Sequence, residues 1–200
     1  MIDRIEGIVQ EVSDNRVIIQ TYAISWDIIV PDPSVYILNE KASLYMYVHW
    51  NQEQGPSLYG FLSSFDRAAF SAIIGCNGVG PKLAVALLHD LGASGFVQAI
   101  TMHDDQALSN VTGIGAKKAE QIIVSLKHKI NKLIASSNID LSSIQATSVW
   151  RDVDLALISL NYSRQEINRT LDILRKDSDA HALAFDQLMR RALAHITRKQ

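Results

Sequence analysis

The sequence contains little cysteine: Cys76 is the single one among 200 residues. One cysteine excludes a disulfide within the chain and fits a reducing, cytoplasmic environment. Metal binding gains no support either, because no second cysteine stands near Cys76 and the six histidines are scattered. Cys76 is therefore expected to be a small buried apolar residue rather than a nucleophile or a metal ligand.

Long apolar runs and a leader pattern are also missing. No stretch approaches the roughly 18 consecutive apolar residues that a membrane-spanning helix needs, so no membrane partner is expected. The first residues, Met1 to Glu6, lack the basic and then apolar pattern of a secretion signal.

An excess of positive charge is absent as well, and the formal net charge is −2. A domain that binds nucleic acid by bulk attraction is normally basic. The charge is unevenly distributed, however: residues 1–62 hold three Lys or Arg against eight Asp or Glu, and residues 63–132 hold seven against five. Any binding of nucleic acid must therefore depend on a few well-positioned contacts rather than on bulk electrostatic attraction.

Residues 1–62 read as β-structure. Short β-prone segments separated by polar turns predict five strands, over residues 5–12, 16–21, 26–31, 42–50 and 57–61. Five short strands in about sixty residues favour a small closed barrel, of which the OB-fold is the commonest form. A small SH3-like barrel is the structural alternative.

From Ser64 onward the apolar period changes from two to 3.6, which indicates helices. Residues 63–132 contain one proline, Pro81, placed where a helix would begin. Residues 133–148 are polar and serine-rich and are expected to form a flexible linker. The expected fold class is α+β multidomain.

Residues 149–200 predict a bundle of three short helices. Apolar residues recur at helical spacing in three runs, and the first of these includes Val153, Leu155 and Leu160. Asn161 follows that run, and asparagine tolerates the left-handed conformation that commonly ends a helix.

The most informative feature is an internal repeat. Residues 77–91 align without gaps on residues 112–126, an offset of 35. Both copies contain a glycine, one apolar residue, a second glycine, and a lysine two positions further on. The candidate DNA-binding residues are Asn77, Gly78, Val79, Gly80 and Lys82 in the first copy, and Gly113, Ile114, Gly115, Lys117 and Lys118 in the second.

This pattern suits the backbone of a nucleic acid. Glycines permit a tight turn between helices and the close approach of a ligand. The second glycine opens a helix, whose N–H groups and positive dipole end attract phosphate. The middle residue, Val79 or Ile114, is expected to point inward. Phosphate contacts are blind to base sequence, and two such hairpins could hold both strands across a minor groove.

Two structural alternatives require no ligand. The hairpins could be glycine turns between helices, or belong to a solenoid, although solenoids usually need at least three repeats.

The order of these parts resembles the RuvA family, the Holliday-junction recognition subunits of the bacterial RuvAB branch-migration complex. Residues 58–61, Leu-Tyr-Gly-Phe, and residues 77–82, Asn-Gly-Val-Gly-Pro-Lys, carry the resemblance. It implies an OB-fold barrel, a tandem helix-hairpin-helix domain and a C-terminal UBA-like bundle. The corresponding domains are residues 1–62, 63–132 and 149–200.

The resemblance also implies partners and a cellular role. It implies a homotetramer that holds a four-way junction on one face, or an octamer that clasps it between two tetramers. The C-terminal bundle would bind RuvB, the ATPase motor, with the RuvC resolvase joining the larger complex. The roles would be homologous recombination, DNA repair and the SOS response to DNA damage. No catalytic residue, cofactor or metal is expected, and the sequence has no Gly-x-x-x-x-Gly-Lys-Ser/Thr phosphate loop.

The sequence departs from the family at several positions. In the family, two neighbouring acids on a central turn form a pin that repels DNA, whereas residues 51–56 contain only Glu53. The usual Gly-Val-Gly-Tyr turn reads Ala-Ile-Ser-Trp at residues 23–26. Ala116 and Gln121 occupy positions that are commonly basic, and Asn161 replaces the glycine of a Leu-Gly-Tyr turn.

Two other functions stay open at this point. Helix-hairpin-helix units also occur in DNA glycosylases, which need a catalytic Asp about twenty residues after the hairpin, and Asp104 and Asp105 lie near that spacing. An Asp there more naturally caps a helix. The other alternative is a protein-interaction scaffold that does not bind DNA.

Overall fold

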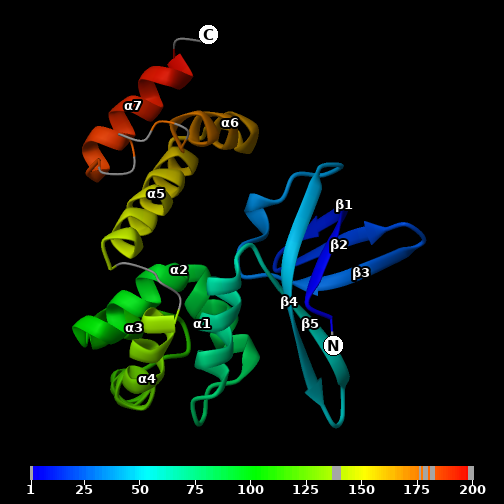
Figure 1. The fold of residues 1–200 in the computed structure, drawn as a ribbon, viewed down its shortest axis with the longest axis vertical. Helices are drawn as coiled ribbons and strands as arrows, with labels where there is room; N and C mark the ends of the chain where they lie inside the picture. Colours follow the sequence, from blue (N-terminus) through cyan, green and yellow to red (C-terminus); the bar gives the residue numbers. More distant parts are fainter. Residues whose placement is uncertain (1, 137–140, 176, 178–179, 181–182, 198–200) are drawn as a thin grey trace. The chain divides into compact units, whose positions relative to one another are not determined.

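The computed structural model describes residues 2–136, 141–175, 177, 180 and 183–197. The chain divides into two compact units, residues 1–138 and residues 139–200. Unit 1 contains strands β1–β5 and helices α1–α4, and unit 2 contains helices α5–α7 (Figure 1). Each unit is considered by itself below.

The N-terminal part of unit 1 is a closed five-stranded barrel, which confirms the expected OB-type fold. Its strands pair in the order β1-β2-β3-β5-β4, and β4 returns to β1. All pairs are antiparallel except β3 with β5. Alternate residues fill the interior, among them Val17, Ile19, Ile28 and Leu44, all fully buried. The strands are β1 (Arg4–Ser13), β2 (Arg16–Thr21), β3 (Ile24–Ile29), β4 (Lys41–Asn51) and β5 (Gly55–Phe61), with a 3-10 turn, η1, at Pro33–Val35.

The turn between β2 and β3 is tighter than the sequence suggested. Strand β3 begins at Ile24, so only Tyr22 and Ala23 form the connection. Tyr22 takes a left-handed backbone conformation, with φ of 51°, and its side chain is fully exposed. The left-handed region costs an L-residue roughly 1–2 kcal/mol, so this turn carries local strain.

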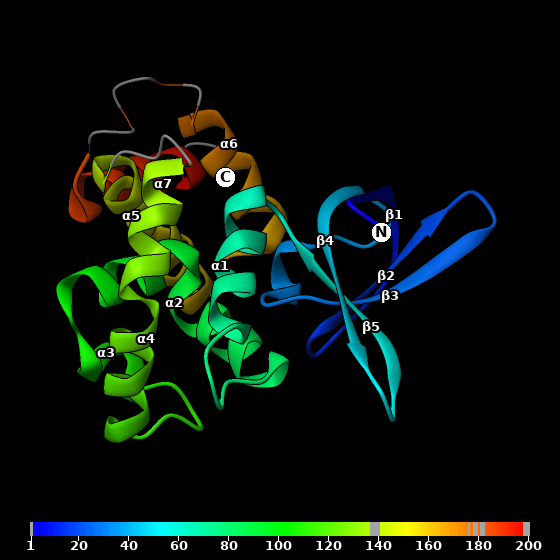
Figure 2. The same ribbon diagram turned by 60° about the horizontal axis from the view of Figure 1, so that its bottom comes forward.

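Strands β4 and β5 extend beyond the barrel as a two-stranded ribbon. Strand β1 pairs with β4 only from Lys41 to Tyr45, and β3 pairs with β5 at Tyr59. Residues 48–58, called the ribbon here, pair only across their own hairpin within residues 2–136. Figures 1 and 2 both show the ribbon projecting from the barrel.

Four helices complete unit 1: α1 (Ser64–Ile74), α2 (Pro81–Met102), α3 (Asp105–Ser109) and α4 (Ala116–Ser136). Helix α1 opens with a reciprocal cap, because the Ser63 hydroxyl accepts from the Asp66 N–H at 3.0 Å and donates to its carboxylate at 2.6 Å. Helix α2 breaks at Gly92, which has φ of 66°. Residues 81–91 and 93–102 are therefore two helical segments, and the first ends where the sequence repeat ends.

Helix α2 is, among the described residues, the one helix long and apolar enough to cross a membrane. Half of its most apolar window is buried inside the structure, and the break at Gly92 interrupts it. Its side chains Leu87, Phe96 and Ile100 are fully buried. These properties are those of the central core helix of a folded unit.

An aromatic cluster joins the helices of unit 1 to its barrel. The ring of Phe70, on α1, is fully buried and lies 5.3 Å from the ring of Tyr47, 4.9 Å from Tyr59 and 4.9 Å from Phe61, measured between centroids. Burial also raises the pKa of the Tyr59 hydroxyl, with the Arg16 charge acting in the opposite direction. The cluster therefore packs α1 directly against β4 and β5.

Polar contacts reinforce this junction. Arg67, on α1, donates to the Asp3 carboxylate at 2.6 Å, and its guanidinium lies 5.4 Å from the centre of the Tyr45 ring. Nδ1 of His89, on α2, lies 2.7 Å from the Pro31 carbonyl oxygen. Polar contacts from both α1 and α2 thus tie the helices of unit 1 to the barrel.

Unit 2 is a three-helix bundle, as expected, formed by α5 (Leu141–Ser159), α6 (Arg164–Arg175) and α7 (Phe185–Thr197). The predicted stop at Asn161 is confirmed by its φ of 68°. A capping box opens α6, where the Ser163 N–H donates to the Glu166 carboxylate at 2.9 Å. The hydrogen bonds from Ser163 lower the pKa of Glu166. The core of the bundle contains Val153, Leu157, Ile167, Leu171, Leu188 and Ala192.

The expectation of a flexible linker over residues 133–148 needs correction. Helix α4 continues to Ser136 and α5 begins at Leu141, so residues 133–136 and 141–148 of the expected linker are helical, while 137–140 lie outside the described residues. The sequence has no glycine or proline after Gly115, and serine or threonine costs a helix only a few tenths of a kcal/mol each. Leu155, in α5, and Leu160, which follows that helix, lie on the surface and are 45% and 55% exposed.

Replacing Phe70 by alanine should lower the free energy of unfolding by about 3–5 kcal/mol, because the change leaves a cavity within the aromatic cluster. Chemical denaturation followed by far-UV circular dichroism measures this loss. Leu62→Ala is the matched control, since Leu62 is 56% exposed, and it should change stability by less than about 0.5 kcal/mol. Similar values for both variants would contradict the packing described.

Candidate nucleic-acid interface

The first hairpin connects α1 to α2 through six residues, Gly75 to Gly80. The N–H of Val79 donates to the Cys76 carbonyl at 3.1 Å, and Gly78 between them has φ of 77°. Gly80 is the N-cap of α2, and its carbonyl accepts from the N–H groups of Leu83 and Ala84 at 3.1 and 3.0 Å. Only glycine adopts the Gly78 conformation without strain.

The second hairpin repeats this hydrogen-bond pattern 35 residues later. The N–H of Ile114 donates to the Val111 carbonyl at 3.0 Å, and Gly113 has φ of 91°. The Gly115 carbonyl accepts from Lys118 and Ala119 at 2.9 and 3.0 Å. The two copies of the sequence repeat therefore have the same local structure.

Apolar side chains hold each hairpin from beneath. Val79 and Ile114 are 5% and 4% exposed, which confirms that the middle residues point inward. Cys76 and Val111, the equivalent residues three positions earlier, are also buried. Cys76 is thus a buried apolar residue as expected, with its sulfur 2.8 Å from the Ser125 hydroxyl oxygen.

The outer surface of both hairpins is open. A Cβ built on Gly78, Gly80 or Gly115 would meet no atom within 4 Å. A Cβ on Gly113 would meet Leu83, from the first repeat, at 3.4 Å, so the two hairpins lie next to each other. The fold therefore does not need the missing side chains for packing, and their absence leaves the backbone accessible.

The accessible backbone is the start of a helix in each case. The first N–H groups of a helix have no acceptor within it, and in α2 and α4 these belong to Lys82, Ala116 and Lys117. The positive end of the helix dipole adds to the attraction for an anion. A phosphate oxygen at either position would accept hydrogen bonds from these N–H groups, for which the helix itself has no acceptor.

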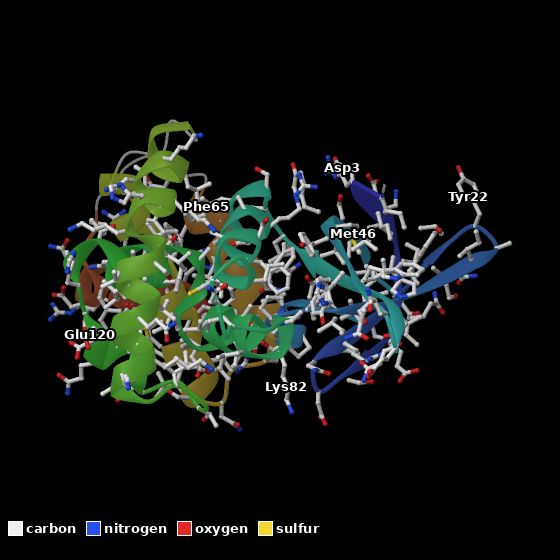
Figure 3. All side chains as sticks on the ribbon, turned by 90° about the horizontal axis from the view of Figure 1, so that it is seen from below. Asp3, Tyr22, Met46, Phe65, Lys82 and Glu120 are labelled. Carbon is white, nitrogen blue, oxygen red and sulfur yellow. The ribbon has the colours of Figure 1, made fainter. Side chains whose placement is uncertain are left out.

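Lysine side chains stand beside both helix starts. Lys82 and Lys117 are exposed and Lys118 is partly buried. Figure 3 shows Lys82 and Glu120 both extending away from the helices that carry them. Ala116 brings no charge, as Pro81 brings none in the first copy, and Glu120 lies one turn from Lys117. Lys118 offsets the charge of Glu120, so each hairpin has a net charge of +1 at its helix start.

The turn of the ribbon carries Glu53 at its tip. The Asn51 side-chain oxygen accepts from the N–H groups of Glu53 and Gln54 at 2.8 and 3.1 Å, which fixes the turn. Glu53 itself is exposed. In Figures 1 and 2 the ribbon and the loop that opens α2 end on the same side of unit 1. An approaching DNA molecule would therefore meet the hairpins and the carboxylate together.

The candidate glycosylase acid has a structural role. Asp104 caps α3, where its carboxylate accepts from the Ala107 N–H at 2.9 Å. Among the described residues, no group of three or more His, Cys, Asp or Glu side chains is placed to hold a metal ion.

Adding a methyl group at Gly80 or Gly115 should weaken binding to duplex DNA at least tenfold without harming the fold. Both sites are open and neither has a positive φ, so alanine fits, while its Cβ holds a phosphate away from the N–H groups. Thermal melting and fluorescence-anisotropy titration measure the two effects. Gly78→Ala is the contrasting control, since its positive φ should reduce stability by roughly 1–2 kcal/mol. Unchanged DNA affinity in Gly80→Ala and Gly115→Ala would contradict this assignment.

Comparison with known proteins agrees with both parts of unit 1. Residues 1–60 match the family model of the RuvA N-terminal domain, and residues 70–128 match that of a SAM-like helix-hairpin-helix tandem.

Relatives that match this chain over nearly its whole length share the same protein name. The chain is 31% identical to the Holliday junction branch migration complex subunit RuvA of Oceanobacillus iheyensis, over 99% of this chain and all of the relative. It is 32% identical to that of Pseudomonas fluorescens, over 96% and 98%, and 29% identical to that of Lactobacillus acidophilus, over the full length of both. With its closed barrel, its tandem hairpins and this identity along the whole length, the chain belongs to the RuvA family.

Proposed function

We propose that this chain is a non-catalytic subunit of a branch-migration complex and binds the four-way DNA junction itself. The observation that carries the proposal is the pair of equivalent, open helix starts on the same side of unit 1 as the acid-tipped ribbon. The relatives are named as Holliday junction branch migration complex subunits, which agrees with this chemistry.

Each hairpin grips one stretch of DNA backbone. A phosphate sits against the first N–H groups of α2 or α4, and Lys82 or Lys117 neutralises its charge. Since the hairpins adjoin at Leu83 and Gly113, the two phosphates belong to opposite strands across one minor groove. Base edges are not contacted, so the grip works on any arm of any junction.

Preference for a junction comes from assembling several such grips around a centre that repels DNA. In the proposed homotetramer, four ribbons meet at the crossover and four Glu53 carboxylates face the phosphates there. One acid per subunit in place of two halves the central charge, so the repulsion is correspondingly weaker. A second tetramer on the opposite face would give an octamer that encloses the junction.

Unit 2 is the proposed docking site for the RuvB motor, with RuvC joining the larger complex in the cytoplasm. Its described surface carries four large apolar side chains that are available to contact a partner. These are Leu155, Leu160, Ile173 and Phe185, from 38% to 55% exposed. ATP hydrolysis is assigned to that partner.

Reversing the charge of Lys82 or Lys117 should weaken junction binding at least tenfold and reduce the slope of log affinity against log salt, because each variant loses phosphate contacts. Gel-shift titrations of Lys82→Glu and Lys117→Glu, with a synthetic four-way junction and a linear duplex at several salt concentrations, test this. Lys41→Glu, at the start of β4, controls for net charge alone.

The wild-type protein should also bind the junction more tightly than the linear duplex. Equal binding to both DNAs would overturn the junction assignment, and unchanged affinity of both hairpin variants would show that the hairpins do not face DNA.

A further inference from the structure

The ribbon carries an exposed tryptophan that takes no part in the proposed phosphate contacts of the hairpins. Trp50 is 69% exposed and is paired with Pro56 across the hairpin. On β4 it shares a face with Leu44 and Met46, which are 0% and 2% exposed inside the barrel. The same face becomes exposed at Trp50 because neither β1 nor β3 reaches this part of the ribbon within residues 2–136.

The charge of the ribbon determines what this face can bind. Residues 48–58 contain no lysine or arginine, and Glu53 is their only acid. A phosphate therefore finds no lysine or arginine on the ribbon, whose one histidine is His49, and is repelled by the Glu53 carboxylate at its tip. The Trp50 indole offers a broad neutral π-face, and a nucleobase is the part of DNA that such a surface binds best.

The position of the ribbon indicates which part of the bound DNA Trp50 would meet. It ends on the same side of unit 1 as the loop that opens α2 (Figures 1 and 2). In the proposed homotetramer, whose four ribbons meet at the crossover, DNA held by the hairpins would bring the base pairs that open there against the ribbon. Apolar side chains, proline among them, act as wedges between base steps in other DNA-binding proteins.

We propose that Trp50, supported by Pro56, stacks on an unpaired base at the crossover of the bound junction. This inference rests on the proposed junction binding and adds a second element to the ribbon beside the carboxylate. Glu53 repels the two backbones, while Trp50 replaces the stacking that an opened base loses. The tryptophan thereby compensates for the single acid of this ribbon.

Tryptophan emission provides the direct test on the full-length protein. Stacking on a base quenches indole fluorescence, so a synthetic four-way junction should quench the wild type strongly and a linear duplex should not. Trp50→Phe keeps Trp26 and Trp150 but should lose the junction-specific quenching. Its junction affinity should stay within about threefold of wild type, since phenylalanine retains a π-face.

Trp50→Ala removes the π-face and should weaken junction binding by about 5- to 150-fold, with duplex affinity unchanged. Leu38→Ala is the matched control, because Leu38 is 54% exposed and precedes the opposite end of β4. It should change neither affinity. Light scattering without DNA should give the same mass for wild type and Trp50→Ala.

Two results would overturn the inference. Junction quenching that persists in Trp50→Phe, with unchanged junction affinity in Trp50→Ala, would show that Trp50 does not meet a base. A lower mass for Trp50→Ala, with junction and duplex affinity falling together, would place Trp50 between copies of the chain. A wild type that binds junction and duplex equally would instead contradict the proposed function itself.

Discussion

Backbone N–H groups at the start of a helix have no acceptor within that helix, and the account of this protein depends on two such groups of donors. Glycine hairpins hold the starts of α2 and α4 at the surface, with Val79 and Ile114 buried beneath them and open space above Gly80 and Gly115. The donors are therefore fixed before any ligand arrives, so little ordering is needed on binding. This explains how a chain with a net charge of −2 can hold a polyanion.

The barrel gives these donors a fixed relation to the ribbon. Phe70 packs against Tyr47, Tyr59 and Phe61, and Arg67 reaches Asp3, the residue before β1. A hairpin domain on a flexible tether would grip any duplex equally well. One packed against the barrel presents its grip at a set position relative to Glu53, which repeated copies need in order to recognise a branched DNA.

Much of this could be predicted from the sequence, because local patterns determine it. Period-two segments indicated five strands, the 35-residue repeat indicated two equivalent hairpins, and Asn161 indicated a left-handed stop. The prediction of a flexible linker over residues 133–148 was partly wrong, because polar composition does not end a helix that lacks glycine and proline. The exposure of Trp50 and Leu160 and the packing of Phe70 depend on which elements meet in space, which periodicity does not reveal. A ribbon longer than its neighbouring strands is the signal that could have identified Trp50.

The most direct measurement of the central claim is backbone amide NMR of the protein titrated with a four-way junction. The amide resonances of Gly80, Lys82, Gly115 and Lys117 should show the largest shifts, and their exchange with solvent should slow as phosphate oxygens accept their hydrogen bonds. Amides of the β2–β3 turn, around Tyr22, should remain unchanged. Junction binding that leaves the hairpin amides unshifted, with the largest changes elsewhere on unit 1, would contradict the claim that helix starts hold the DNA.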